Sequence, residues 1–468
     1  MSRIYGSNGV FDNLLSLQKR NYLLRMYLFC QNTLKTDKQI IFEQTPLGQL
    51  RKILPIEKLS KLIPERKSKS GAPGWANAEG MIAMLFLQSY TQLSDRKFID
   101  HFNGNWQMQM FCGMQLALNE TIKDRNLMSR IRAEVSKCLN LEEFQTILLK
   151  DWKSYLENTH VGMSDATVYE SYMRYPTDVK LLWECCEYLQ RELEKLHEKL
   201  GLKFSSKRYA KKKQTYLLYA RRRKKPYRLT RKMRKTLLQL TGRLQETLQE
   251  KLNTYAAHAG SAELQPVFGK LRIIRKIITQ QRYLITYPDS KLSDRILSLH
   301  KPYVRAIVRG KETKTVEFGA KAHVIQVDGI NYIEHLSYDA FNETTRLRRS
   351  ILKHKQLFGK CFQWSADAIY ATNKNRTYTT AARITTNFVP KGHPKDDPAE
   401  KQMKALLNKE RSTRLEGSFG TEKNYYGLAK VKARKQATEV LCIYFAVMTA
   451  NAVRISNRQQ NTLLRQAA

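Results

Sequence analysis

Residues 160–169 constrain the fold most, because they combine the pattern of a short apolar strand with one acidic residue, Asp165, among small neighbours. Acidic residues are depleted in β-strands. A carboxylate at a mostly buried strand position needs a partner or a metal ion. A turn or a helix N-cap would also account for a single Asp, so the meaning of Asp165 depends on the rest of the chain.

The chain carries a large excess of positive charge, with 82 Lys and Arg against 42 Asp and Glu and a formal net charge of +40. A compact fold with this charge repels itself unless a polyanion screens it, and nucleic acid is the usual partner. The longest apolar run, residues 440–453, is too short to span a bilayer. None of the seven cysteines forms a C-x-x-C pair, which argues against zinc fingers. We therefore expect a soluble, intracellular protein that binds nucleic acid and no membrane.

The most basic segment is residues 203–235, which contain sixteen Lys or Arg and no Asp or Glu. Such density without balancing acid favours a surface for the phosphate backbone of DNA over an ordinary solvated face. The DNA contacts expected in this segment are Lys211, Lys212, Lys213, Arg221, Arg222 and Arg223. The tyrosines among them could stack on bases, but packing within a helical hairpin is the favoured interpretation.

Helical patterning and changes of composition divide the chain into regions of an α/β (α+β) protein. A segment at 66–74 has linker composition, and helical spacing is clear at 11–33 and at 78–90. The predicted regions are an N-terminal helical segment with linker at 1–75, an all-helical DNA-binding domain at 76–150, a catalytic core at 155–185 and 311–455, and a basic helical insertion at 186–310.

A β-hairpin is predicted where two β-patterned runs, residues 316–327 and 330–336, meet at Asp328-Gly329. Asp328 is therefore a turn residue first, with a smaller chance of being catalytic. Gly329 suits the second position of such a turn.

A second strand with an acidic residue follows a helix over 342–358 that ends at Gly359. This short apolar strand, residues 361–366, stops at Asp367 and leads into a loop and a helix. The carboxylate then lies at the carboxyl edge of its strand, where α/β sheets collect their ligands. A last strand is expected at 382–388.

A third carboxylate, Glu416, lies two helical turns before Lys423, so both side chains point the same way. Arg411 and Arg414 bracket it. A carboxylate among cations suits a metal site that faces a phosphate backbone, and an ordinary charged helix face is the equal alternative. Asp165, Asp367 and Glu416 thus follow one another in the order strand, strand, helix.

This constellation resembles the DDE transposases of bacterial insertion sequences, over most of the chain. Each block is weak alone, but their order is specific. The blocks that carry the resemblance are Ser164-Asp165-Ala166-Thr167; Arg309-Gly310-Lys311 with Glu317-Phe318-Gly319-Ala320-Lys321; Ala366-Asp367-Ala368-Ile369-Tyr370 with Asn375-Arg376; Arg414-Leu415-Glu416 with Phe419-Gly420, Lys423 and Gly427-Leu428; and an N-terminal helical part at 81–114 with Leu93-Ser94-Asp95-Arg96. Related third blocks carry a Tyr and an Arg at set distances before the Glu, whereas this chain has Ser412, with arginines at 411 and 414. Glu422 therefore stays open as an alternative third ligand.

The resemblance implies a ribonuclease H-like mixed sheet flanked by helices, with Asp165, Asp367 and Glu416 as catalytic metal ligands. Arg411, Arg414 and Lys423 would contact DNA. Three carboxylates suit Mg²⁺, and two ions are expected, with Mn²⁺ as a substitute. The implied partners are double-stranded DNA, as terminal inverted repeats and target, and a second copy in a homodimer on paired ends, in the cytoplasm at the nucleoid.

The resemblance implies cleavage and strand transfer at the ends of the element. Two alternatives remain open: a metal-dependent nuclease on the same core, and a catalytically inactive DNA-binding protein descended from a transposase.

Overall fold

The computed structural model describes residues 37–64, 76–117, 119–203, 205–256, 264–308, 316–392 and 397–467. The helix expected at 11–33, the linker at 66–74 and the segment Arg309-Gly310-Lys311 lie outside these residues. The chain forms two compact units. The catalytic unit comprises residues 1–170, 321–337 and 341–468, and the helical unit comprises residues 171–320 and 338–340.

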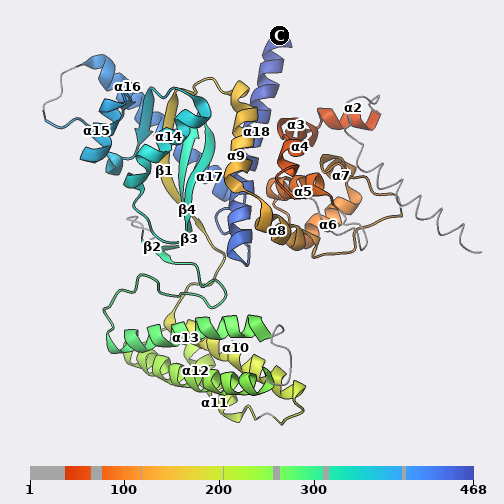
Figure 1. Ribbon diagram of the computed structural model, residues 1–468, viewed down its shortest axis with the longest axis vertical. Coiled ribbons are helices and arrows are strands. Elements are labelled where there is room, and N and C mark those ends of the chain that lie inside the picture. The colour runs from red at the N-terminus through yellow and green to blue at the C-terminus, as the bar shows by residue number, and fades with distance from the viewer. Residues whose placement is uncertain are drawn as a thin grey trace, which may run out of the picture. The chain divides into compact units, whose positions relative to one another are not determined.

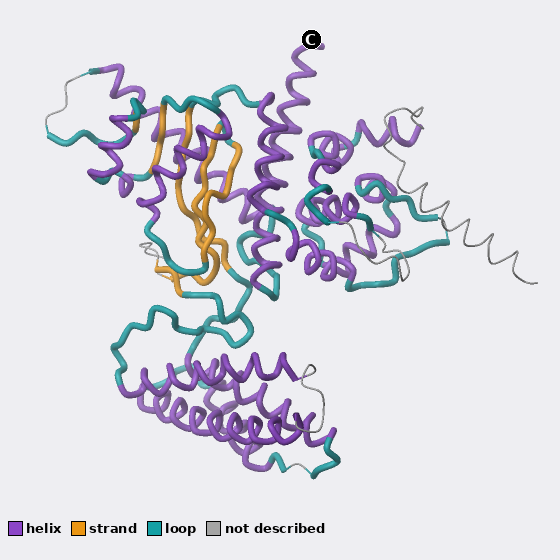
Figure 2. Tube along the Cα trace, viewed as in Figure 1, coloured by secondary structure: helices purple, strands orange, loops and turns teal. Residues whose placement is uncertain are grey.

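The N-terminal part of the catalytic unit is helical, as expected (Figures 1 and 2). Its helices are α2 (Asp37–Gln44), α3 (Pro46–Ile53), α4 (Ile56–Ser60), α5 (Ala78–Thr91), α6 (Asp95–Gly104), α7 (Trp106–Phe111), α8 (Leu127–Cys138) and α9 (Leu141–Trp152), followed by the 3₁₀ turn η1 (Lys153–Tyr155). Side-chain caps start several of them: Asn77 accepts from the amide of Gly80 at α5, and Asn140 accepts from Glu142 and Glu143 at α9.

The C-terminal helix α18 (Gln436–Ala467) joins these helices to the sheet. It packs on α5, α8 and β4 (Ile330–Ser337). Phe445 of α18 lies 4.9 Å from Phe86 of α5 and 4.8 Å from Phe144 of α9, measured between ring centroids. Its stretch Gln436–Thr462 is long and apolar enough to cross a membrane by length and composition, although most of it is buried within the protein, as in a core helix.

A mixed six-stranded sheet forms the centre of the catalytic unit and confirms the expected α/β class. The remaining strands are β1 (Val161–Glu170), β2 (Ala306–Val308), β3 (Val316–Val327), β5 (Gln363–Ala366) and β6 (Thr385–Thr386). The order is β2-β3-β1-β5-β6, and β4 pairs with β3. β5 runs parallel to β1 and to β6, whereas β3 is antiparallel to β2 and β4. The last strand is two residues long, much shorter than the 382–388 expected.

The predicted hairpin is confirmed. Asp328 and Gly329 connect β3 to β4 with φ angles of 46° and 79°, the left-handed conformation that a tight hairpin turn requires. The helices around the sheet are η3 (Glu343–Arg346), α14 (Leu347–Phe358), η4 (Ala368–Tyr370), α15 (Asn373–Ala381), α16 (Pro398–Glu410), the π-helical turn η5 (Arg411–Leu415) and α17 (Glu416–Tyr425). Gly359 ends α14 at a φ of 96°, as predicted.

The helical unit contains α10 (Asp178–Lys199), α11 (Lys207–Arg221), α12 (Tyr227–Ala256) and α13 (Gln265–Thr286). The boundary expected at residue 186 falls inside α10. The structure places it at residue 171, because α10 is one continuous helix whose leucines pack into the core of the helical unit. Two tyrosines of the basic segment, Tyr209 and Tyr216, stack on Trp183 of α10 at 5.5 and 4.4 Å. They pack within the unit, as favoured.

Candidate active site

Asp165 and Asp367 lie side by side on neighbouring parallel strands. Ser164 of β1 is in register with Ala366 of β5, so the next residue of each chain segment is an aspartate. Residues in register on parallel strands point to the same face of the sheet. Because β5 ends at Ala366 while β1 continues to Glu170, the two carboxylates stand where the sheet opens.

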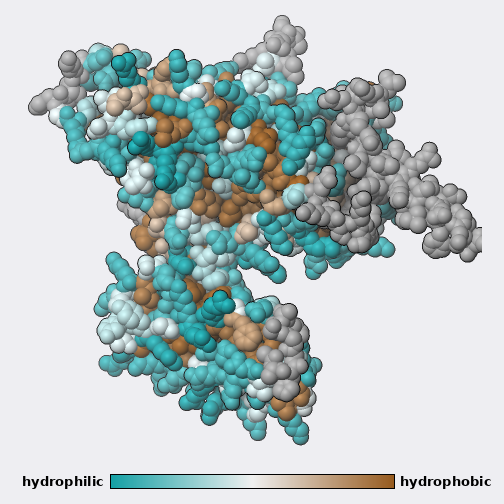
Figure 3. Space-filling model, viewed as in Figure 1, coloured by the Kyte–Doolittle hydropathy of each residue, from teal (hydrophilic) through white to brown (hydrophobic). Residues whose placement is uncertain are grey.

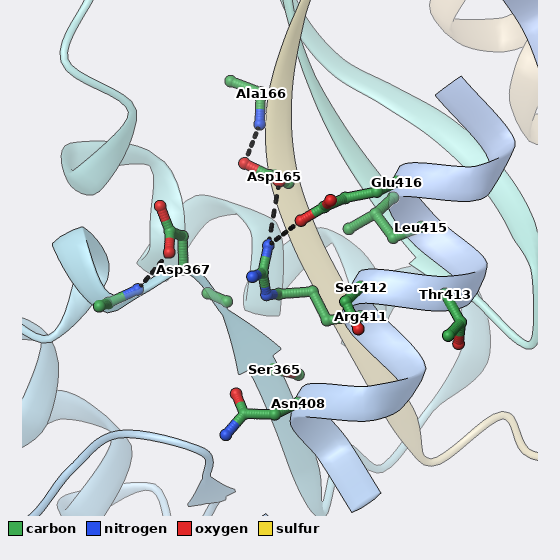
Figure 4. Close-up of polar contacts among 12 residues, drawn as sticks. Asp165, Ala166, Ser365, Asp367, Asn408, Arg411, Ser412, Thr413, Leu415 and Glu416 are labelled. Carbon is green, nitrogen blue, oxygen red and sulfur yellow. Dashed lines mark hydrogen bonds and ion pairs between the residues drawn. The ribbon is translucent and has the colours of Figure 1, made fainter. Parts of the chain in front are cut away.

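The local backbone fixes one oxygen of each aspartate. The amide of Ala166 donates to Oδ1 of Asp165, and the amide of Ala368 donates to Oδ1 of Asp367, each at 2.7 Å (Figure 4). The end of β5 is held in turn by Asn387, whose side chain accepts from the amide of Ala366 and donates to its carbonyl. The second oxygen of each aspartate is thereby oriented by the backbone.

Glu416 reaches the same place from a helix with one unusual turn. The amide of Glu416 donates to the carbonyl of Arg411, five residues earlier, which is the hydrogen bond of a π-helix. Residues five apart would face different sides of an α-helix, and the extra residue in this turn aligns them. Nη1 of Arg411 lies 3.0 Å from Oε1 of Glu416 and 3.3 Å from Oδ2 of Asp165 (Figure 4).

The π-helical turn accounts for the departure at Ser412. The related pattern places an arginine there, and the added residue gives Arg411 the side of the helix that position 412 would take in an α-helix. Ser412 is exposed. Arg411 is therefore the arginine that accompanies the third carboxylate. A sequence offers no direct signal for such a turn.

Burial dominates the electrostatics of Asp165. It raises the pKa of this carboxyl to about 6, against the Ala166 amide and Arg411, which lower it, and with Glu343 and Asp367, which raise it further. A carboxylate in this position is short of positive charge.

Glu422 lies on the same helix in a different environment. Its side chain is buried, and its oxygens accept from the hydroxyl of Tyr169 at 2.5 Å and from Nδ2 of Asn331 at 2.6 Å. Burial raises its pKa to about 7, although both hydrogen bonds lower it. Asn331 is itself held by Asn451 of α18. Glu422 thus belongs to a polar network in the core, one that sequence patterns did not indicate.

Asp328 has partners that the hairpin prediction missed. Its carboxylate accepts from Nη1 of Arg458 at 2.9 Å, from Nη1 of Arg414 at 3.4 Å and from the amide of Glu157 at 3.1 Å. It therefore ties the turn to α18 and to the π-helical turn. Its oxygens are occupied by these donors.

The basic residues expected to contact DNA fall in two places. Arg414 belongs to the π-helical turn and pairs with Glu410 at 2.8 Å as well as with Asp328. Lys423 follows Glu416 by two turns on α17. The others lie on α11 and the loop after it: Lys211, Lys212, Lys213, Arg221, Arg222 and Arg223. Within the described part of the chain no acidic side chain pairs with these six, and hydrophilic side chains cover much of the helical unit's visible face (Figure 3).

The donor set suits a hard divalent cation, because all three candidate side chains offer carboxylate oxygens. Among the described residues, no three acidic, histidine or cysteine side chains converge on one point. Instead the Arg411 guanidinium lies between Asp165 and Glu416 and supplies positive charge there. Cation binding therefore requires that side chain to move.

Comparison with known proteins yields two family matches. A model described as a transposase domain (DUF772) matches residues 34–134, and a model described as a transposase DDE domain matches residues 364–451. The first spans helices α2 to α8, and the second includes Asp367 and Glu416 but begins after Asp165 in the sequence. No curated protein and no solved structure matches the chain.

Proposed function

The chain belongs to the DDE transposases of insertion sequences, and we propose that it cuts DNA at the ends of its element and joins the freed ends to target DNA with the help of divalent metal ions. The observation that carries this proposal is the placement of three carboxylates. Asp165 and Asp367 are adjacent in register, and Arg411 links Asp165 to Glu416.

Asp165, Asp367 and Glu416 would hold Mg²⁺, with two ions expected and Mn²⁺ as a substitute. Such ions, when bound, stabilise the negative charge that gathers on the oxygens of the attacked phosphodiester. The fixed Oδ1 atoms of the two aspartates leave their Oδ2 atoms oriented for this task. No side chain needs to be the nucleophile, because water attacks first and the freed 3′-hydroxyl attacks the target.

Arg411 changes partners in this proposal. Without a cation it neutralises Asp165 and Glu416, and a cation that binds these carboxylates frees its guanidinium. Arginine matches phosphate with two parallel hydrogen bonds. Arg411, with Arg414 and Lys423 on the same continuous helix, then holds DNA phosphates beside the site.

DNA binding is divided between regions. The six cations of α11 and its loop bind the backbone of any duplex, and the helices within residues 76–150 read the terminal inverted repeats. Two copies on paired ends form the active homodimer.

The test uses linear DNA that carries the short inverted repeats flanking the gene, incubated with the full chain and Mg²⁺. We expect cleavage at the repeat ends and joining of those ends to a second duplex, with neither in Asp367→Asn. Cleavage without joining would indicate the nuclease. A gel shift with no cleavage in Mg²⁺ or Mn²⁺ would indicate an inactive DNA-binding protein.

A further inference from the structure

Glu343 approaches the carboxylates from a fourth segment of the chain. It is the first residue of η3, which packs against η4, the turn that Asp367 caps. One side chain ties the two turns together: Nδ2 of Asn375 donates to the carbonyls of Thr344 and Tyr370, both at 2.9 Å. The segment of Glu343 is therefore fixed beside the carboxyl end of β5.

The charges of this region act on one another. Among neighbouring acids, Glu343 raises the pKa of Asp165 more than Asp367 does. Tyr370 is fully buried, and after burial itself the groups that raise its pKa are Glu343, Asp165, Asp367 and Glu334. The Tyr370 hydroxyl thus lies among the same carboxyls.

Two buried polar atoms here have no hydrogen-bond partner among the described residues: Oε2 of Glu343 and the hydroxyl of Tyr370. Buried polar atoms are normally satisfied by protein or by water, and an exception needs an explanation. Mg²⁺ keeps several of its waters when it binds. A hydrated cation would supply a ligand position for the carboxylate oxygen and a partner for the hydroxyl.

We propose that Glu343 is a fourth acidic residue of the site, which together with Asp165 holds a divalent cation, and that Tyr370 hydrogen-bonds to the carboxylates or the water around that cation. This inference rests on the proposed function of Asp165, Asp367 and Glu416. It gives the two expected cations four carboxylates instead of three.

The competing role for Glu343 is structural. Nζ of Lys321 lies 3.3 Å from Oε2 of Glu343 and donates to the carbonyl of Phe341 at 3.1 Å. An ion pair that only supports the fold can be replaced as a unit, because no charge is then left alone. A ligand to a cation cannot be replaced in this way.

The experiment titrates the full chain with Mn²⁺ in the absence of DNA, following free Mn²⁺ by electron paramagnetic resonance and the melting midpoint by calorimetry. The variants are Asp165→Asn, Glu343→Gln and the double variant Lys321→Met with Glu343→Gln. Glu142→Gln is the matched control, since Glu142 is an exposed acid of the same unit that pairs with Lys353 at 2.6 Å.

We expect Glu343→Gln and the double variant each to lose about tenfold or more in affinity for one Mn²⁺ ion, with the control unchanged. If Glu343→Gln unfolds because Lys321 is left unpaired, the double variant alone decides. A double variant that binds Mn²⁺ like the wild type, while Asp165→Asn does not, would overturn the role of Glu343 and leave the proposed function standing. Wild-type binding in Asp165→Asn would overturn the proposed function itself.

Discussion

At the carboxyl edge of the sheet Asp165 and Glu416 share the cation of Arg411 and Asp367 stands beside them, whereas on α11 and its loop six cations have no acid within the described residues. The edge depends on position: backbone amides, a π-helical turn and register pairing place each oxygen. The basic surface depends on charge, and its side chains are mostly exposed. Cleavage and DNA binding should therefore respond to different substitutions.

The largest effect is expected at the edge. Asp165→Asn and Asp367→Asn should each lower cleavage of end DNA on the order of 10³-fold, because a neutral amide cannot hold a cation as a carboxylate does. Binding in a gel shift should be unchanged, since neither residue belongs to the basic surface. Substantial cleavage by either variant would remove that aspartate from the site.

The next effect concerns the basic surface. Replacing Lys211, Lys212, Lys213, Arg221, Arg222 and Arg223 by Gln should weaken binding to terminal and random DNA alike, because each cation that neutralises a phosphate releases counterions. The slope of log affinity against log salt should flatten by roughly 0.9 for each phosphate that is no longer neutralised, up to about 5 in total. A salt titration measures this slope.

The control for that titration is the pair Arg191→Gln and Lys195→Gln in the same unit. Both cations already pair with Glu192, so the slope should stay as in the wild type. An unchanged slope in the six-fold variant would mean that the basic segment is only a solvated face.

A smaller effect is expected at Asp328. Asp328→Asn keeps the turn, since Asn-Gly supports the same conformation, but weakens the contacts to Arg414 and Arg458. We expect the free energy of unfolding in urea to fall by about 1–2 kcal/mol, discounted because both arginines are partly exposed, with cleavage nearly intact. A folded variant as inactive as Asp367→Asn would make Asp328 the second catalytic aspartate.

The smallest effect concerns the core below the edge. Burial raises the pKa of Glu422 from an ordinary 4.5 to about 7, so the folded chain holds this proton more tightly than the unfolded chain. Its contribution to stability is then present at low pH and is lost as the pH rises from about 4.5 to about 7. Glu422→Gln should flatten the dependence of the melting midpoint on pH across this window. A dependence as steep as that of the wild type would place the titration on another group.

Local signals sufficed for part of this architecture. Asp328-Gly329 predicted the hairpin because turn chemistry is encoded in two residues, and Asp367 was placed at a strand end because the apolar run stops there. The α/β class and the helical N-terminal part followed from periodicity.

The rest depended on tertiary packing. The π-helical turn that aligns Arg411 with Glu416 has no sequence signature, and Glu343 approaches Asp165 only through the contact of η3 with η4. The start of the helical unit was placed inside α10, because a composition change at Lys203 does not mark where a helix begins to pack. The merging of the N-terminal helices with α18 likewise rests on Phe86, Phe144 and Phe445, which lie far apart in the sequence.

The central claim is that acids at the edge act on DNA while acids below it support the fold, and α17 carries one of each. The most direct measurement compares Mg²⁺-dependent cleavage of end DNA by Glu416→Gln and Glu422→Gln at saturating protein. The account predicts that Glu416→Gln loses cleavage while binding DNA normally. Glu422→Gln should cleave close to the wild-type rate, because Gln resembles the protonated acid that burial favours. Full cleavage by Glu416→Gln together with its loss in a folded Glu422→Gln would contradict the account and make Glu422 the third ligand.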